Sequence, residues 1–177
     1  LMFKPPEPWE NHVEYEAFLG ELKCAKVLFH WVREAKENDI LEYFKVEPGD
    51  LYRLVERADW LLYATQELAR LFGYRDLLPQ LSELRVRVKY GIKPELLPLV
   101  YLEGVGRVRA RALFNSGFKT VESLKHESLT ELITVPGIGD RVARRIKEQV
   151  GGMIKRRELK GEALKKAGVQ ESLETFA

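Results

Sequence analysis

A tryptophan and an arginine in the segment LYRLVERADWLLYATQEL (residues 51–68) could bind one ligand together. Arg53 and Trp60 are seven residues apart, so on an α-helix they lie about two turns apart on one face, with Arg57 between them. An exposed indole offers a surface on which an unpaired base can stack, and a neighbouring guanidinium can bind the phosphate of the same strand. The alternative is that another helix or domain covers the indole.

A repeat in the second half supplies a second set of candidate residues. LEGVGRVRARALF (102–114) and VPGIGDRVARRI (135–146) align at a constant offset of 33 residues. Each copy holds a glycine–hydrophobic–glycine turn, which lets the backbone approach a ligand closely. The amides of the following helix, together with its dipole, then form an anion site. Such a turn binds phosphate without reading base sequence. The predicted DNA-binding residues are Gly104, Val105, Gly106, Arg107, Arg109 and Arg111 in the first copy, and Gly137, Ile138, Gly139, Arg141 and Arg144 in the second.

The two copies differ at the start of their second helix. Asp140 would place an anion there in the second copy, where it competes with phosphate. We therefore expect the first turn, with Arg107 and Arg109, to bind more strongly. The alternative is a tandem domain that serves packing or dimerisation and makes no DNA contact.

The elements that must position these residues are expected to be helices. Residues 1–13, with three prolines, predict an extended lead-in, and a first helix is expected from about Glu14 to Lys36. Asn38 is expected to cap a short helix, and Asp50 to cap the long helix over residues 51–72. The apolar periodicity predicts two buried stripes: Phe18, Leu19, Leu22, Ala25, Leu28, Phe29 and Val32 on the first helix, and Leu51, Leu54, Val55, Ala58, Leu61, Leu62, Thr65, Leu68 and Ala69 on the long one.

The remaining segments complete an all-α prediction. A helix is expected from Leu77 to Tyr90, so that residues 14–92 form a small helical bundle. Residues 93–152 are expected to form a tandem helix-hairpin-helix domain of two packed units. Within it, Gly117 is expected to end a helix, Thr120 to cap the next, and Ser128 with Glu131 to form a capping box. Residues 153–177 are a basic tail.

Composition narrows the class of protein. Hydrophobic residues are 45% and charged residues 32% of the 177, which indicates a globular chain. Residues 1–94 carry a net charge of −2 and residues 95–177 of +4, so the second half is the better candidate for a polyanion partner. One cysteine and three scattered histidines give no metal-ligand spacing, and the lone thiol favours an intracellular, cytoplasmic or nucleoid-associated protein. The sequence shows no signal peptide and no apolar run long enough to span a membrane. Its few Asn and Gln residues, beside many Glu, Lys and Arg, are typical of a protein from a thermophile.

Residues 95–150 resemble the tandem helix-hairpin-helix DNA-binding domains of repair and recombination proteins. The wider chain, over about residues 14–150, resembles the end of the archaeal Ski-type superfamily-two DNA helicases, which include Hjm and have HelQ as the eukaryotic relative. The match is carried by ELKCAKVLFHWV (21–32), EPGDLYRLVERADWLLYA (47–64), LRVRVKYGIKPELLPLV (84–100) and GVGRVRARALFNSGF (104–118).

The resemblance implies roles for these segments. The long helix would be the ratchet helix that lies along the single strand leaving the motor, with Trp60 stacking on a base and Arg53 beside it. The hairpin domain would grip the exiting strand and restrain the motor. Single-stranded and branched or forked DNA are the implied partners.

No residues of an ATPase motor are present in the sequence. It contains no GxxxxGK[ST] loop and no DEAH-like acidic motif. The chain itself is therefore expected to bind no cofactor and to hydrolyse no ATP, since ATP and magnesium would bind motor domains that it lacks. It is expected to be either a piece of a helicase or a free-standing relative of its tail.

The tail carries a candidate partner site. Gln170, Leu173 and Phe176 have the spacing of a sliding-clamp-binding box, although Ala177 stands where a second aromatic is usual. A tail that docks on its own domain explains the pattern as well. KRRELKGEALKK (155–166) is either a solvated helix face or a DNA-binding stretch.

Two other function classes compete with a DNA-binding helicase region. Base-excision glycosylases also contain hairpin motifs, but they need a catalytic Asp downstream, and no Asp follows Asp140. A non-enzymatic interaction module would dimerise through the hairpins or be tethered to a clamp through the tail.

Overall fold

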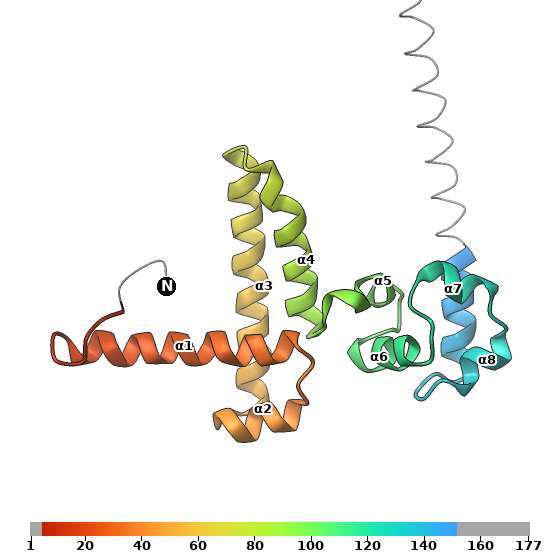
Figure 1. The fold of residues 1–177 in the computed structure, drawn as a ribbon, viewed down its shortest axis with the longest axis horizontal. Helices are drawn as coiled ribbons and strands as arrows, with labels where there is room; N and C mark the ends of the chain where they lie inside the picture. The colour runs from red at the N-terminus through yellow and green to blue at the C-terminus, as the bar shows by residue number, and fades with distance from the viewer. Residues whose placement is uncertain (1–4, 152–177) are drawn as a thin grey trace, which may run out of the picture. The chain divides into compact units, whose positions relative to one another are not determined.

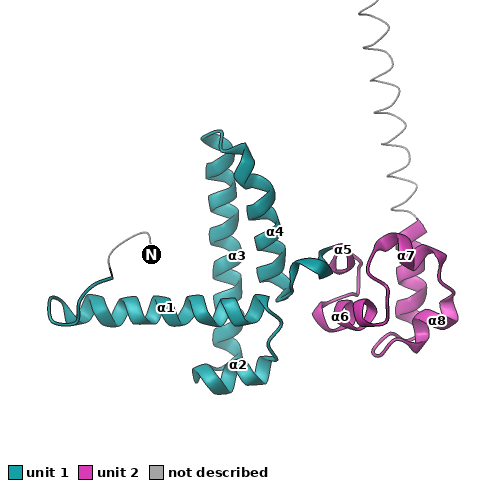
Figure 2. Cartoon of the chain, viewed as in Figure 1, with its two compact units in different colours: residues 1–97 teal, residues 98–177 magenta. Residues whose placement is uncertain are grey.

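The computed structural model describes residues 5–151, and over that range it contains helices and turns but no strand (Figure 1). The predicted all-α fold is confirmed. The chain divides into two compact units, residues 1–97 and residues 98–177 (Figure 2). No helix within the described range is long and apolar enough to cross a membrane.

The first unit is built on α1 (His12–Val32), α2 (Glu37–Phe44), α3 (Pro48–Leu71) and α4 (Leu78–Tyr90). Helices α3 and α4 lie side by side and are joined through a short 3₁₀ turn, η1 (Arg75–Leu77) (Figure 1). Between α1, α2 and α3 lies a core cluster of Val27, Ile40, Phe44 and Leu51.

Helix α1 differs from its prediction at both ends and in its buried face. It begins at His12, because Asn11 Oδ1 accepts the Glu14 amide at 3.3 Å. Val27 and Val32 are buried, whereas Leu19, Leu22 and Phe29 are 43%, 38% and 53% exposed. The predicted stripe was correct at Val32 and wrong at Leu19, Leu22 and Phe29, because periodicity groups residues on a face without showing which part of the face a neighbour covers.

The starts of α2 and α3 also correct the predictions. Lys36, not Asn38, is the N-cap of α2. Helix α3 begins at Pro48 and not at residue 51, with Glu47 as its N-cap. Proline is favoured at the first helical position, where its missing N–H costs nothing. Asp50 therefore sits one turn inside, where its Oδ2 accepts the Glu47 amide at 3.2 Å.

The predicted buried stripe of α3 is confirmed at Leu51 and Ala69 but fails along one edge. Leu61 and Leu68, assigned to the core by periodicity, are 57% and 54% exposed. Helix α4 instead covers the side that carries Asp59: Arg85 Nε lies 2.7 Å from Asp59 Oδ1. The Arg85 guanidinium also lies over the Tyr63 ring, 4.8 Å from its centroid. This ion pair and ring contact link residues far apart in sequence.

A tryptophan ties α1 to the end of α4. Trp31 Nε1 donates to the carbonyl of Val88 at 2.8 Å. Gly91 ends α4 in the left-handed conformation, at φ +64°, as the sequence predicted, and is buried beside that indole. The stretch RVRVKY is helical, as predicted.

The second unit contains four short helices before its last described helix, which covers residues 140–151. They are α5 (Leu97–Val100), α6 (Arg107–Asn115), α7 (Val121–His126) and α8 (Leu129–Thr134), preceded by the 3₁₀ turn η2 (Pro94–Leu96). The predicted local stops are confirmed: Gly117 follows α6 at φ +95°, Thr120 caps α7, and Ser128 forms a capping box with Glu131 at the start of α8. Fully buried side chains fill the centre of the unit: Leu99, Leu102, Leu113, Leu124, Leu132 and Ile146.

Candidate nucleic-acid interface

The two glycine turns of the second unit have the same backbone geometry. Gly104 and Gly137, 33 residues apart, both adopt positive φ, at +81° and +78°. Val105 and Ile138 are 2% and 3% exposed, and each donates its amide at 3.0 Å to the residue three positions earlier. A buried apolar residue thus fixes each turn, while the glycines remain at the surface.

The helix after the first turn presents its amino end at the surface. Gly106 is the N-cap of α6 in an extended conformation, and Arg107 is the first helical residue. Ala110 in α6 and its repeat partner Ala143 are both 0% exposed. Because alanine has only a methyl side chain, the helices that carry these residues can pack closely.

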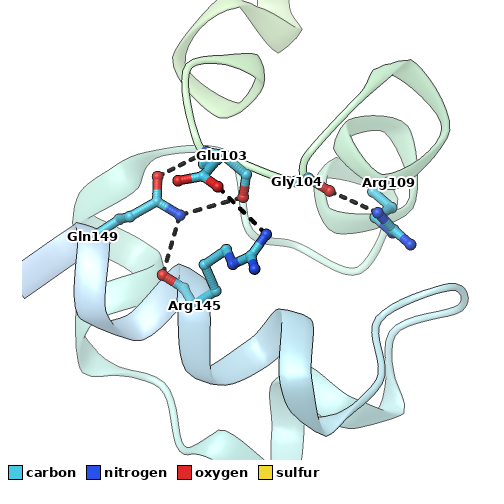
Figure 3. A network of polar contacts seen from close by, with 5 residues as sticks. All are labelled: Glu103, Gly104, Arg109, Arg145 and Gln149. Carbon is cyan, nitrogen blue, oxygen red and sulfur yellow. Dashed lines mark hydrogen bonds and ion pairs between the residues drawn. The ribbon is translucent and has the colours of Figure 1, made fainter.

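Arg109 holds the two turns together. Its Nη1 donates to the Gly104 carbonyl at 2.7 Å and its Nε to the Gly137 carbonyl at 2.9 Å, so one guanidinium bridges equivalent atoms of the two repeats. Figure 3 shows the Gly104 half of this bridge. The repeat partner of Arg109 is Val142, so the bridge is made from one copy only. Arg109 was predicted as a direct phosphate contact, and its position gives it a bridging role as well.

A second polar network fastens the first turn to the helix over residues 140–151 (Figure 3). Gln149 Oε1 accepts the Glu103 amide at 2.7 Å, and Gln149 Nε2 donates to the Glu103 carbonyl at 3.2 Å. Arg145 Nη1 lies 3.4 Å from Glu103 Oε1. Glu103 and Gln149 carry no signal in the sequence, because their repeat partners are Pro136 and Ser116 and no pattern links them.

The second turn carries the expected carboxylate, and an arginine is bound to it. Arg144 Nε lies 2.8 Å from Asp140 Oδ2, and both side chains are more than half exposed. The hydrogen bond from Arg144 lowers the pKa of Asp140 below its ordinary value, so this group is anionic at neutral pH. In the first copy, Arg111 instead lies over the Phe114 ring, 5.1 Å from its centroid. Arg141 is exposed one residue after Asp140.

In the first unit, the candidate residues lie on the exposed side of α3. Trp60 is 66% exposed, so the rest of the described chain does not cover its indole. Arg53 and Arg57 are exposed on the same helix. Arg53 Nη2 lies 2.7 Å from Asp50 Oδ1, and this hydrogen bond is the main cause that lowers the pKa of Asp50. An ion pair this exposed is weak, because solvent screens it, so a phosphate can compete for the arginine.

Comparison with known families covers both units. The family described as archaeal helicase, domain 4, matches residues 1–91. The family described as SAM-like helix-hairpin-helix tandem matches residues 97–151. The chain belongs to the archaeal helicase domain 4 family. The predicted resemblance to the Hjm group of helicases is thereby confirmed.

Individual relatives agree with this family assignment. The ATP-dependent DNA helicase Hel308 of Pyrococcus horikoshii is 45% identical over 148 residues, which are 83% of this chain and 20% of that protein. The Hel308 of Caldivirga maquilingensis is 46% identical over 80% of this chain and 19% of its own length. That of Thermococcus kodakarensis is 42% identical over 81% of the chain and 13% of its own length. The chain thus spans a fifth or less of each of these three relatives, and corresponds to domain 4 and the hairpin region of a Hel308-type helicase.

No candidate metal-binding site is present in the described part of this helicase domain 4 chain. No group of three or more His, Cys, Asp or Glu side chains within residues 5–151 is arranged to hold a metal ion. The predicted clamp-binding residues Gln170, Leu173 and Phe176, and the basic stretch at 155–166, lie outside the described residues.

The carboxylate at the second turn leads to a prediction about DNA affinity. Replacing Asp140 by Asn in this domain 4 chain removes an anion from the start of a helix and weakens the contact of Arg144 with that side chain, because the ion pair is lost. We expect single-stranded DNA to bind about two- to fivefold more tightly. If Arg144 gains one phosphate contact, the slope of log K against log salt concentration becomes steeper by about 0.7. Fluorescence anisotropy across a salt series measures both. The charge-matched control is Glu122→Gln, in the first turn of α7, and an unchanged affinity of Asp140→Asn would show that the second turn does not contact phosphate.

Proposed function

We propose that the chain is the DNA-binding region of an ATP-dependent DNA repair or recombination helicase, and that it grips single-stranded or forked DNA inside the cell. The observation that carries this proposal is Trp60: its indole is 66% exposed on a helix of the helicase domain 4 family. A large aromatic surface left open to solvent suits base stacking, which is worth about 1–3 kcal/mol per base. Arg53 and Arg57 on the same face would neutralise the phosphates of that strand.

In this proposal, the hairpin unit adds contacts that do not depend on base sequence. The exposed glycine turns bring the amides at the start of the following helices to the surface, and Arg107 and Arg141 stand beside them. Backbone amides at a helix amino end bind phosphate oxygens well. Arg109 would support this binding by holding the two turns at a fixed spacing. ATP and magnesium would bind motor domains elsewhere in the parent protein, so this region supplies grip and not hydrolysis.

A titration of labelled single-stranded DNA, followed by anisotropy, tests the proposal. We expect non-specific dissociation constants of about 10⁻⁴–10⁻⁶ M at physiological salt and much tighter binding at low salt. No anisotropy change at low salt would rule out the DNA-binding function. The alternative, a protein-interaction module that dimerises or is tethered to a sliding clamp, predicts self-association or clamp binding with little response to DNA.

Two arginines of the hairpin unit should respond differently in this assay. Arg107→Ala is expected to weaken the binding of single-stranded and duplex DNA alike. Because one phosphate contact is lost, the salt slope, which is the slope of log K against log salt concentration, should become shallower by about 0.7–0.9. Arg109→Ala is expected to lower affinity through loosened turns, with a smaller change in slope, since its bonds go to Gly104 and Gly137. Equal reductions in slope would show that Arg109 acts mainly as a phosphate contact.

A further inference from the structure

A groove between α1 and α3 lies beside the exposed face of α3 and has a volume of about 340 Å³. Its floor is apolar: Val27 and Leu51 are 2% and 4% exposed, and Leu54 packs against the core cluster to which they belong. Its rim is polar and comes from both helices. A site of this size, with an apolar floor and a few polar groups at its edge, is typical of small-ligand and single-nucleotide binding.

Cations dominate the rim of this groove. Lys23 of α1 and Arg53 and Arg57 of α3 line it, against one carboxylate, Asp50. Asp50 is already engaged by Arg53 at 2.7 Å, and the charge of Lys23 acts on the same carboxylate. The excess of positive charge favours an anionic occupant.

The groove is continuous with the face that carries the exposed indole. Arg53, Arg57 and Trp60 share one face of α3, and at 1.5 Å per residue the Cα atoms of Arg57 and Trp60 are about 4.5 Å apart along the helix axis. A strand with one base on Trp60 therefore brings its neighbouring phosphate to the rim. A lipid or a peptide could match the charge, but neither would connect the groove to a flat aromatic surface in this way.

We propose that this groove binds the nucleotide next to the one stacked on Trp60, with its phosphate held between Lys23 and Arg57 and its base or sugar on the apolar floor. The inference rests on the proposed single-strand binding and deepens it. It makes Lys23 a DNA-binding residue, so that α1 grips the strand together with α3.

The only cysteine of the chain offers a direct probe of the groove. Cys24 lines it and is exposed. Iodoacetamide is uncharged, so bound DNA does not repel the reagent itself, and slower alkylation reports DNA lying over the thiol. We expect a saturating thymidine oligonucleotide to slow alkylation of Cys24 at least fivefold in the intact chain, and no slowing would overturn the inference.

Substitution of the lysine provides the second arm of the test. Lys23→Ala is expected to weaken oligonucleotide binding about three- to tenfold and to reduce the salt slope by about 0.7, the value for one phosphate on a single strand. The matched control is Lys26→Ala, an exposed lysine of the same helix that does not line the groove, and it should bind as wild type. If Lys23→Ala binds as wild type while Trp60→Ala does not, the groove assignment is wrong and the proposed function stands. If the wild-type chain binds no DNA, both are wrong.

Discussion

Trp60→Ala is expected to weaken binding of single-stranded DNA about tenfold or more. The indole is 66% exposed and is not part of the core cluster between α1, α2 and α3, so its loss should leave folding nearly unchanged. Stacking on one base is worth about 1–3 kcal/mol, and 1.4 kcal/mol is a factor of ten in affinity. Anisotropy titrations of wild type and variant with the same oligonucleotide measure the ratio.

Two further variants make this result specific to stacking. Trp60→Phe keeps an aromatic face and should recover part of the affinity. Tyr74→Ala removes an aromatic ring that is about equally open to solvent, at 62% exposure, just after the carboxyl end of α3, and should bind as wild type. If Tyr74→Ala lost as much affinity as Trp60→Ala, any exposed aromatic ring would have the same effect, and Trp60 would not be a specific stacking site.

Gly91→Ala is expected to destabilise the first unit by about 2–5 kcal/mol. The glycine has φ +64°, a conformation that costs an L-residue about 1–2 kcal/mol. A methyl group there would also lie 2.7 Å from the Cδ2 and Cζ2 atoms of Trp31, whose Nε1 donates to Val88. Relieving that overlap requires the buried side of the indole to move, which costs about another 1–3 kcal/mol.

The measurement can be restricted to the unit that contains the glycine. All three tryptophans, Trp9, Trp31 and Trp60, lie in the first unit, so their fluorescence during denaturant unfolding follows that unit. Two control glycines separate the causes. Gly73 has φ +79° with open space around it, so Gly73→Ala should cost only the free energy of placing an L-residue at positive φ. Gly20 lies inside α1 with nothing within 4 Å, so Gly20→Ala should stabilise the unit by up to about 1 kcal/mol. If Gly73→Ala costs as much as Gly91→Ala, contact with Trp31 is not the reason.

Several predictions from the sequence were correct because their causes are local. The hairpin turns follow from glycines at a fixed spacing around one apolar residue, and the equivalent hydrogen bonds of Val105 and Ile138 reflect that repeat. The capping box of Ser128 and Glu131 involves four consecutive residues. The start of α3 was wrong by three residues, although its signal, Pro48 after Glu47, is local too.

The assignment of faces failed where it depended on a distant segment. Leu61 and Leu68 fit a buried stripe by spacing, yet α4 covers another side of α3, where Arg85 meets Asp59. The charged residues around Trp60 place it on the face of α3 away from the core. The sequence leaves open whether another helix or domain covers it, and the described structure leaves it 66% exposed.

The sequence by itself determined that the chain is helical, that a glycine turn recurs at an offset of 33 residues, and that Arg53, Arg57 and Trp60 share one helix face. These features depend on residues a few positions apart, whose geometry is set by the helix repeat. Only the tertiary structure decided that Arg109 bridges the carbonyls of Gly104 and Gly137, and that Lys23 joins Arg53 and Arg57 around one groove. Such contacts join segments about 30 residues apart, and their partners are chosen by how the helices pack, which no local pattern encodes.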